Sequence, residues 1–291
     1  MTKRTECLQT ELEVLDWVKN GMTIAIGEPH PMALIRQIIR RGVRDLTIIC
    51  SGLGLDHLIA AGCVTKTISY YAGGGAGVPV VPSFRGAAER SEIEVWECEE
   101  GILTTGLEAA AKGLPFLPWR GGVGTSLTDV NTDLKLFKDP IEGETLIAVP
   151  AIKPDITILH AAQSDAYGNI QHHGGPGWLD LFLARAADKV VVQVEKVVSN
   201  DEIRANPWAT TIEAADAVVY APWGAHPFYS RGYYLQDVPY VRDYLAHAEK
   251  ARTGEPSGLQ SYLDKYCVIP KTHVGYLETI GTERLLSLRE F

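Results

Sequence analysis

Short apolar runs of strand length alternate with amphipathic stretches along most of this sequence. The run at 46–50, L-T-I-I-C, lies between charged residues and S-G-L-G-L, which is typical of a strand buried on both faces of a parallel sheet. The stretch at 32–41 instead repeats its apolar residues at helical spacing, so it predicts an amphipathic helix. The buried stripe of that helix is Leu34, Ile35, Ile38 and Ile39.

The same two patterns recur and predict the remaining elements. Strands are predicted at 22–26, 67–70, 93–97, 145–149, 156–160, 190–194 and 217–220. Helices are predicted at 1–20, 56–61, 102–112 and 179–187, and another begins at Pro82 and Ser83. Because strands alternate with helices throughout, we expect parallel strands joined by right-handed crossovers.

Two segments depart from this alternation. Residues 127–144 are polar and interrupted by turn-forming residues, which indicates a long excursion or a segment that faces a partner. From about residue 238 the chain is helical and charged, with a linker at T-G-E-P-S-G. We therefore predict a single domain over residues 1–291 with a helical C-terminal extension from about 238.

Length and composition restrict the class of protein. None of the apolar runs in the 291 residues approaches the ~20 residues that a transmembrane helix needs, so we expect no membrane association. The start, M-T-K-R-T-E-C, has no apolar signal region, and we expect a cytoplasmic protein. The five cysteines show neither C-x-x-C nor disulfide spacing, which is typical of reduced thiols.

Charge and histidine spacing exclude two further kinds of site. A formal net charge of −9 argues against nucleic acid, because phosphate binding needs concentrated positive charge. An anionic small ligand is still compatible with this charge if a few local arginines meet it. His160, His172 and His173 lack the spacing and the carboxylate partner of a metal site, so no metal is predicted.

Three carboxylates crowd into the turn between the strand at 93–97 and the helix at 102–112. They are Glu97, Glu99 and Glu100. Negative charge near a helix N-terminus is stabilising, so helix capping is one interpretation. The other is catalysis, because crowded carboxylates raise one another's pKa toward the range of a general base.

A glycine loop with one arginine follows the same helix. Arg120 offers a rigid fork of donors for a carboxylate or phosphate, and Gly122 and Gly124 let the backbone approach a ligand closely. Ligands of open α/β sheets usually bind at the carboxyl ends of the strands. The acids and the arginine loop are therefore candidates to meet there.

A second glycine run, G-G-G-A-G at 73–77, cannot form a regular element. It matches neither G-x-G-x-x-G nor a P-loop, which excludes dinucleotide and P-loop interpretations. It is either a flexible surface loop or a loop that lies against a ligand or partner. In the second case Gly74 and Gly75, with Ser83, Phe84 and Arg85 at the start of the next helix, are candidate substrate-binding residues.

A series of segments keeps a recognisable order and spacing over most of the first 230 or so residues. They are I-A-I-G with P-M-A-L-I, R-D-L-T-I-I, P-S-F-R-G-A-A-E, E-G-I-L-T-T-G-L-E-A-A-A-K-G-L-P-F-L-P-W-R-G-G-V-G-T, D-A-Y-G-N, V-E-K-V-V and A-P-W-G-A-H-P. Together they resemble the A (alpha) subunit of class I coenzyme A transferases, most closely the glutaconate CoA-transferase-like branch.

The resemblance implies a fold, a reaction and a partner. The fold is an open α/β fold with a mainly parallel sheet, and the substrate is an acyl-CoA thioester with no permanently bound cofactor. The partner is a homologous B subunit, in a heterodimer or heterotetramer. A glutamate of that partner attacks the thioester, giving an acyl-glutamyl anhydride and then a glutamyl-CoA thioester, so this polypeptide by itself is not a complete transferase.

The chain departs from the family pattern at two places. The turn after the first strand is Gly27-Glu28-Pro29-His30-Pro31, whereas the family usually has a glycine-rich sequence there. Glu99 and Glu100 stand where typical transferases have small or neutral residues, and here the chain resembles relatives that hydrolyse or cleave C–C bonds of ring-derived acyl-CoA substrates in steroid-ring catabolism. In that alternative a glutamate acts as general base and Arg120 holds a substrate carboxylate or carbonyl.

A third hypothesis belongs to another class of protein. A sugar-phosphate-binding regulatory domain has a related α/β fold, but it predicts an appended helix-turn-helix, which the short acidic N-terminal segment does not offer. The partner discriminates between the first two hypotheses. A partner with the nucleophilic glutamate supports transfer, and one without it supports hydrolysis or cleavage.

Overall fold

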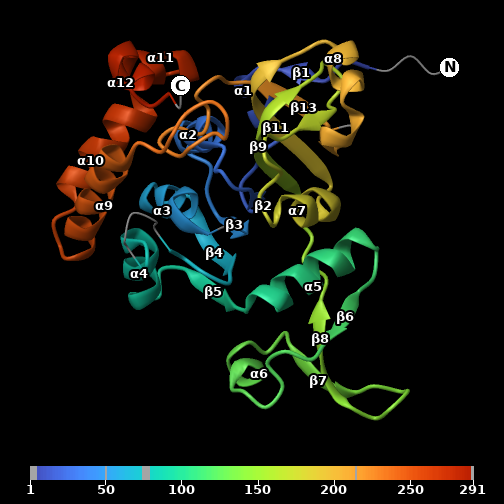
Figure 1. The fold of residues 1–291 in the computed structure, drawn as a ribbon. Coiled ribbons are helices and arrows are strands. Elements are labelled where there is room, and N and C mark those ends of the chain that lie inside the picture. The colour runs from blue at the N-terminus through green and yellow to red at the C-terminus, as the bar shows by residue number, and fades with distance from the viewer. Residues whose placement is uncertain (1–4, 50, 74–78, 214, 290–291) are drawn as a thin grey trace.

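A central parallel sheet organises the chain. The computed structural model describes residues 5–49, 51–73, 79–213 and 215–289. Within them a ten-stranded sheet contains the path β1-β13-β11-β9-β2-β3-β4-β5, in which all neighbours pair in parallel. These strands are β1 (Leu8–Gln9), β2 (Thr23–Ile26), β3 (Leu46–Ile49), β4 (Val64–Ser69), β5 (Glu94–Glu97), β9 (Ile156–Ser164), β11 (Lys189–Val197) and β13 (Ala217–Tyr220). The expected open, mainly parallel sheet is confirmed (Figure 1).

Helices cover both faces of this sheet because successive residues of a strand point to opposite sides. Ile24 and Ile26 of β2 pack in one apolar cluster with α2 and the C-terminal helices, whereas Ala25 packs in another with α5 and α7. The covering helices are α2 (Met32–Arg41), α3 (Gly52–Ala60), α4 (Pro82–Glu89), α5 (Glu100–Ala111) and α7 (Asp180–Ala186). None of the described helices is long and apolar enough to cross a membrane.

The C-terminal residues form a set of helices on one side of the sheet, orange and red in Figure 1. They are α9 (Val238–Arg252), α10 (Ser257–Leu263), a π-helical turn at Asp264–Val268, α11 (His273–Ile280) and α12 (Thr282–Leu286). Tyr244 and Leu245 of α9 and Leu263 of α10 are buried in the cluster that contains α2. The predicted helical tail is thus packed on the body of the protein.

A small antiparallel sheet corrects the expectation of parallel pairing throughout. It consists of β6 (Phe116–Trp119), β8 (Thr145–Pro150) and β7 (Lys135–Lys138), in that order, with α6 (Leu127–Val130) between β6 and β7. Figure 1 shows it extending away from the main sheet beyond α5. The predicted strand at 145–149 exists, but the short β7–β8 connection permits only antiparallel pairing.

Several predicted boundaries also differ from the structure. The predicted helix at 1–20 is reduced to α1 (Glu11–Leu15), which Thr10 caps in a capping box with Glu13, and Leu8–Gln9 pairs with β13 instead. Helix α3 begins at Gly52, before the predicted start at Asp56. The smaller elements are β10 (Ile170–Gln171), α8 (Asn200–Ala205), a 3₁₀ turn at Pro207–Ala209 and β12 (Thr210–Ile212).

Candidate active site

The carboxyl ends of neighbouring parallel strands bring polar side chains from distant parts of the sequence to one edge of the sheet. Glu28 follows β2, Ser51 follows β3, Tyr70 follows β4 and Glu100 follows β5. Because β2, β3, β4 and β5 are consecutive neighbours, these residues occupy one side of the molecule.

Glu99 is held in place as the N-cap of α5. Its carboxylate accepts hydrogen bonds from the backbone N–H groups of Gly101 (2.7 Å) and Ile102 (2.8 Å). The indole Nε1 of Trp119 donates a third hydrogen bond to Oε1 at 2.7 Å. A Cβ at Gly101 would overlap the Trp119 ring, so glycine is needed there. Of the two interpretations of Glu99, these contacts are those of helix capping.

Glu100 is placed differently from its neighbour. It is the first residue of α5 and its side chain is exposed. Its negative charge, together with that of Glu28, contributes to raising the pKa of Tyr70, although burial of the phenol is the largest cause. Glu100 and Glu28 therefore lie close enough to Tyr70 to act on it electrostatically.

Tyr70 and Trp178 form an aromatic wall beside these acids. The Trp178 Nε1 donates a hydrogen bond to the Tyr70 hydroxyl at 3.1 Å, and the two rings meet edge to face with centroids 5.3 Å apart. A small surface cavity opens here, and Glu28, Ser51, Tyr70, Trp178 and Leu179 are among its lining residues. The lining thus combines an aromatic wall with one acid, Glu28, and two hydroxyls, Ser51 and Tyr70.

Asp180 fixes Glu28 at this edge. Its buried carboxylate accepts the backbone N–H of Glu28 at 3.1 Å and that of Gly177 at 3.0 Å. A Cβ at Gly27 would overlap both Asp180 and Leu159, so the turn after β2 can pass this close only as glycine. Burial raises the pKa of Asp180 to about 7, and the Glu28 charge adds to the rise.

The structure brings the arginine loop only partly to the predicted acids. Trp119 contacts Glu99, but the exposed guanidinium of the next residue, Arg120, forms an ion pair with Glu144. Gly122 and Gly124 adopt the left-handed conformation with φ of 83° and 82°, which explains why glycines occur in this loop. Among the described residues, no hydrogen bond or ion pair joins Arg120 to Glu100.

The candidates at the start of α4 lie at a helix junction. The backbone N–H of Phe84 donates to the buried Asp56 carboxylate at 2.8 Å, and Ser83 also adjoins this carboxylate, whose pKa burial raises to about 6. The Phe84 ring packs against the main apolar cluster. These contacts stabilise the start of α4. They are explained by a structural role of Ser83 and Phe84 without any bound substrate.

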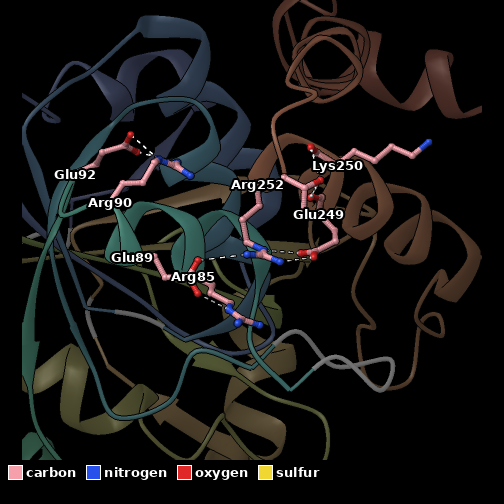
Figure 2. Close-up of polar contacts among 8 residues, drawn as sticks. Arg85, Glu89, Arg90, Glu92, Glu249, Lys250 and Arg252 are labelled. Atoms are coloured by element: carbon pink, nitrogen blue, oxygen red, sulfur yellow. Dashed lines mark hydrogen bonds and ion pairs between the residues drawn. The ribbon is translucent and has the colours of Figure 1, made fainter.

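Charged side chains link α4 to α9 on the surface. Arg85 pairs with Glu89 at 2.8 Å, and Arg252 reaches both Glu89 (3.3 Å) and Glu249 (2.7 Å). Dashed lines mark these ion pairs in Figure 2. Arg85 is thus engaged within its own helix. The other two candidates from this region, Gly74 and Gly75, lie outside the described residues.

Sequence reasoning missed four of the residues that line this edge. The sequence marks Glu28 only as part of a turn that departs from a glycine-rich pattern, and no motif marks Tyr70, Trp178 or Asp180. Position is the signal in the sequence, because Glu28 follows the predicted strand at 22–26 and Tyr70 ends the predicted strand at 67–70. In the described part of the chain, no group of three or more His, Cys, Asp or Glu side chains is arranged to hold a metal ion.

Comparison with known proteins places this site in context. Residues 13–219 match the family model described as Coenzyme A transferase. The chain is 37% identical over 292 residues to an uncharacterised protein of Archaeoglobus fulgidus, covering 97% of this chain and 64% of that protein. It is 34% identical to the A subunit of 3-oxoadipate CoA-transferase from Pseudomonas knackmussii, over 90% of this chain and 93% of that one.

Two further similarities bear on the chemistry. The chain is 36% identical to the cholesterol ring-cleaving hydrolase IpdA subunit of Rhodococcus jostii, over 86% of this chain and 88% of that one. The crystal structure of glutaconate coenzyme A-transferase from Acidaminococcus fermentans superposes with a TM-score of 0.90 and 29% identity, over 98% of this chain and 96% of that one.

Proposed function

Since the chain belongs to the coenzyme A transferase family, we propose that it is the A (alpha) component of a heteromeric enzyme that exchanges coenzyme A between an acyl-CoA thioester and a carboxylic acid. The observation that carries the proposal is the agreement over almost the whole chain with glutaconate coenzyme A-transferase, at a TM-score of 0.90. A relative with 34% identity that is itself one component of a two-component transferase supports the requirement for a second polypeptide.

In this proposal the partner supplies the nucleophile. A glutamate of the B subunit attacks the thioester carbonyl. The C–S bond breaks, the coenzyme A thiolate departs, and an acyl-glutamyl anhydride remains on the enzyme. The thiolate then attacks the glutamyl carbonyl of the anhydride, which releases the first acid and leaves a glutamyl-CoA thioester. The acceptor acid then reacts with the glutamyl-CoA thioester by the same steps in reverse order, which gives the new acyl-CoA and frees the glutamate. Splitting the exchange in this way replaces one difficult step by easier ones.

The residues of this chain then bind and orient the acyl group. Tyr70 and Trp178 offer an apolar wall at the carboxyl edge of the sheet. Arg120 would hold a carboxylate or carbonyl of the substrate. To do so it must leave Glu144, and exchanging an exposed ion pair for another costs only about 0–1 kcal/mol.

A second candidate function is hydrolysis or C–C cleavage of an acyl-CoA substrate. The specific observation in its favour is the 36% identity to the cholesterol ring-cleaving hydrolase IpdA subunit. Glu100 suits the role of general base better than Glu99, because both oxygens of the Glu99 carboxylate are already engaged in hydrogen bonds from Gly101, Ile102 and Trp119. Glu100 is exposed at the same helix start and its charge reaches Tyr70.

Co-purification of the native complex separates the two functions. The complex is assayed against a panel of acyl-CoA thioesters with and without acetate or succinate as acceptor. Acceptor-dependent appearance of acetyl-CoA or succinyl-CoA supports transfer. Release of free coenzyme A or of a ring-opened acyl product without an acceptor supports the second function. The partner sequence provides an independent check, since transfer requires its glutamate.

A further inference from the structure

An open groove lies on the surface between α7 and β12. Its volume is about 650 Å³, which is the size range of pockets that take an organic molecule or a large side chain. The floor is apolar and includes Leu181, Ala184, Val190 and Ile212. All four belong to the apolar cluster on this face of the sheet. The groove is therefore a place where a second apolar group can join the core of the protein.

Trp208 is a large apolar side chain that its own chain leaves uncovered. It is 95% exposed, on the 3₁₀ turn that follows α8. Tryptophan is highly buried in most proteins, because its ring has more apolar surface to remove from water than other side chains. Among surface residues it is enriched where two proteins meet. An indole held out on a turn therefore indicates burial against another molecule.

The exposed indole and the groove are neighbours on one surface. Trp208 is two residues before Thr210, which lines the groove, yet the indole is too exposed to fill the groove of its own chain. In a two-fold contact the same patch of both copies meets. A two-fold axis between the indole and the groove therefore puts the indole of each copy into the groove of the other. This surface is complementary to a second copy of itself.

The charges beside these two features are complementary as well. Arg204 is exposed in the last turn of α8, four residues before Trp208, and pairs with no acid in the described ranges. The rim of the groove carries two exposed acids, Glu213 and Asp216. The rim of one copy thus offers a counter-charge to Arg204 of the other. Arg185, the base among the lining residues, can stack on the inserted indole.

This surface is separate from the candidate active site. Val190 is near the start of β11 and Asp216 directly precedes β13, so the groove reaches the amino ends of these strands. Glu28 and Tyr70 follow the carboxyl ends of β2 and β4, which lie at the opposite edge of the parallel sheet. In Figure 1, α8 is at the top of the molecule and α5 is toward the bottom. A second copy on the groove therefore leaves the site edge free for another partner.

We propose that Trp208 and this groove form a two-fold interface between two copies of this chain. Trp208 of each copy lies in the groove of the other, and Arg204 pairs with Glu213 across the contact. The inference goes beyond the proposed function, because it holds whatever reaction the heteromer carries out. For that heteromer it predicts two copies of this chain in each particle. Its tests use no thioester, so they are independent of the transferase assay.

The mass of the full chain in solution tests the interface. Light scattering during gel filtration should give twice the 31.8 kDa of one chain at micromolar concentrations. Trp208→Ala should weaken the dimer at least about 30-fold, as the loss of a central anchor does. Trp208→Phe keeps an aromatic ring and should remain dimeric.

Ile141→Ala is the matched control, because Ile141 is an apolar side chain that is 89% exposed in the loop between β7 and β8. It should leave the dimer unchanged. A monomeric unmodified chain, or a dimer that Trp208→Ala does not weaken, overturns the proposal. If the chain is monomeric and Trp208→Ala instead prevents binding of the B subunit, the groove belongs to that partner and the proposal also fails.

Charge reversal tests how the two copies are aligned. Arg204→Glu and Glu213→Arg should each weaken the dimer about tenfold, because each places like charges opposite one another. The double variant should recover the dimer, since the pair forms again with its signs exchanged. Failure of the double variant to recover contradicts the pairing of Arg204 with Glu213.

Cross-linking identifies the position of the indole directly. A photoreactive benzoyl-phenylalanine replaces Trp208 in an equal mixture of unlabelled and ¹⁵N-labelled full chain. After irradiation we expect a cross-linked peptide that contains residues of α7 and carries both isotope labels, which shows that it joins two copies. Cross-links confined to single chains, or to peptides outside the groove, contradict the interface.

Discussion

The indole of Trp119 donates a hydrogen bond to the carboxylate of Glu99 at 2.7 Å. This contact joins the first strand of the small antiparallel sheet to the N-cap of α5. It also places the arginine loop next to the acidic turn, because Arg120 directly follows Trp119. The relative position of Glu100 and Arg120 therefore depends on Trp119.

Loss of this hydrogen bond should destabilise the protein. We expect Trp119→Phe to lower the free energy of unfolding by about 1–2 kcal/mol, since a hydrogen bond to a charged group is lost. Urea denaturation of the full chain measures it. Trp208→Phe is the matched control, because Trp208 is 95% exposed and its replacement should change stability by less than about 0.5 kcal/mol. Equal effects of the two variants would show that the contact contributes nothing.

Glu100 is the acid that should affect turnover. If it acts as a general base, Glu100→Gln should lower kcat of the heteromer by about 10²-fold without changing its assembly. Glu108→Gln is the control on the same helix, where Glu108 only pairs with Lys112 on the surface at 2.6 Å. If Glu100→Gln keeps the wild-type kcat with every productive thioester, Glu100 has no catalytic role and the acidic turn serves only to cap the helix.

Arg120 should affect substrate binding more than folding. We expect Arg120→Ala to lower turnover at subsaturating substrate through a KM about tenfold higher, because the fork that binds a substrate oxygen is lost. The exposed pair with Glu144 predicts a stability change below about 1 kcal/mol. Arg90→Ala, which breaks the exposed pair with Glu92, is the control and should leave KM unchanged. An unchanged KM in both variants would show that Arg120 does not bind the substrate.

Asp180 predicts a specific pH dependence of stability. Its pKa is raised to about 7 in the folded protein by burial, from 3.8, so the folded state keeps a proton that the unfolded state has released. Stability from this group is therefore lost as pH rises from about 4 to about 7. Between pH 5 and 7.5 the wild type should lose about 2–3 kcal/mol relative to Asp180→Asn, which does not titrate. Urea midpoints at both pH values measure this, and a constant difference between the two proteins would contradict a buried protonated carboxyl.

Local patterns predicted the elements whose structure depends on local sequence. The helix at 32–41 and the strand at 217–220 have the predicted bounds, because a complete apolar stripe or run defines each of them. The small sheet could not be predicted in this way. Its strands carry Pro118 and Pro150 and are joined through polar residues, so only the pairing of distant segments reveals it.

The same distinction applies to the site. Glu99, Glu100 and Arg120 lie beside a helix whose ends the sequence marks with acids and glycines, so they form recognisable motifs. The contact between Glu28 and Asp180 joins residues 152 positions apart, so it depends on how the turn after β2 packs against the start of α7. No spacing in the sequence encodes this contact.

The most direct test of the proposed function is an acyl-transfer assay of this chain with and without its co-expressed B subunit. Coenzyme A exchange from an acyl-CoA thioester to acetate or succinate is followed on the purified chain and on the purified heteromer. We predict no activity from the chain by itself and activity from a stable heteromer, because in the proposed mechanism the partner supplies the nucleophile. Full acyl-transfer activity from the isolated chain would contradict the proposal.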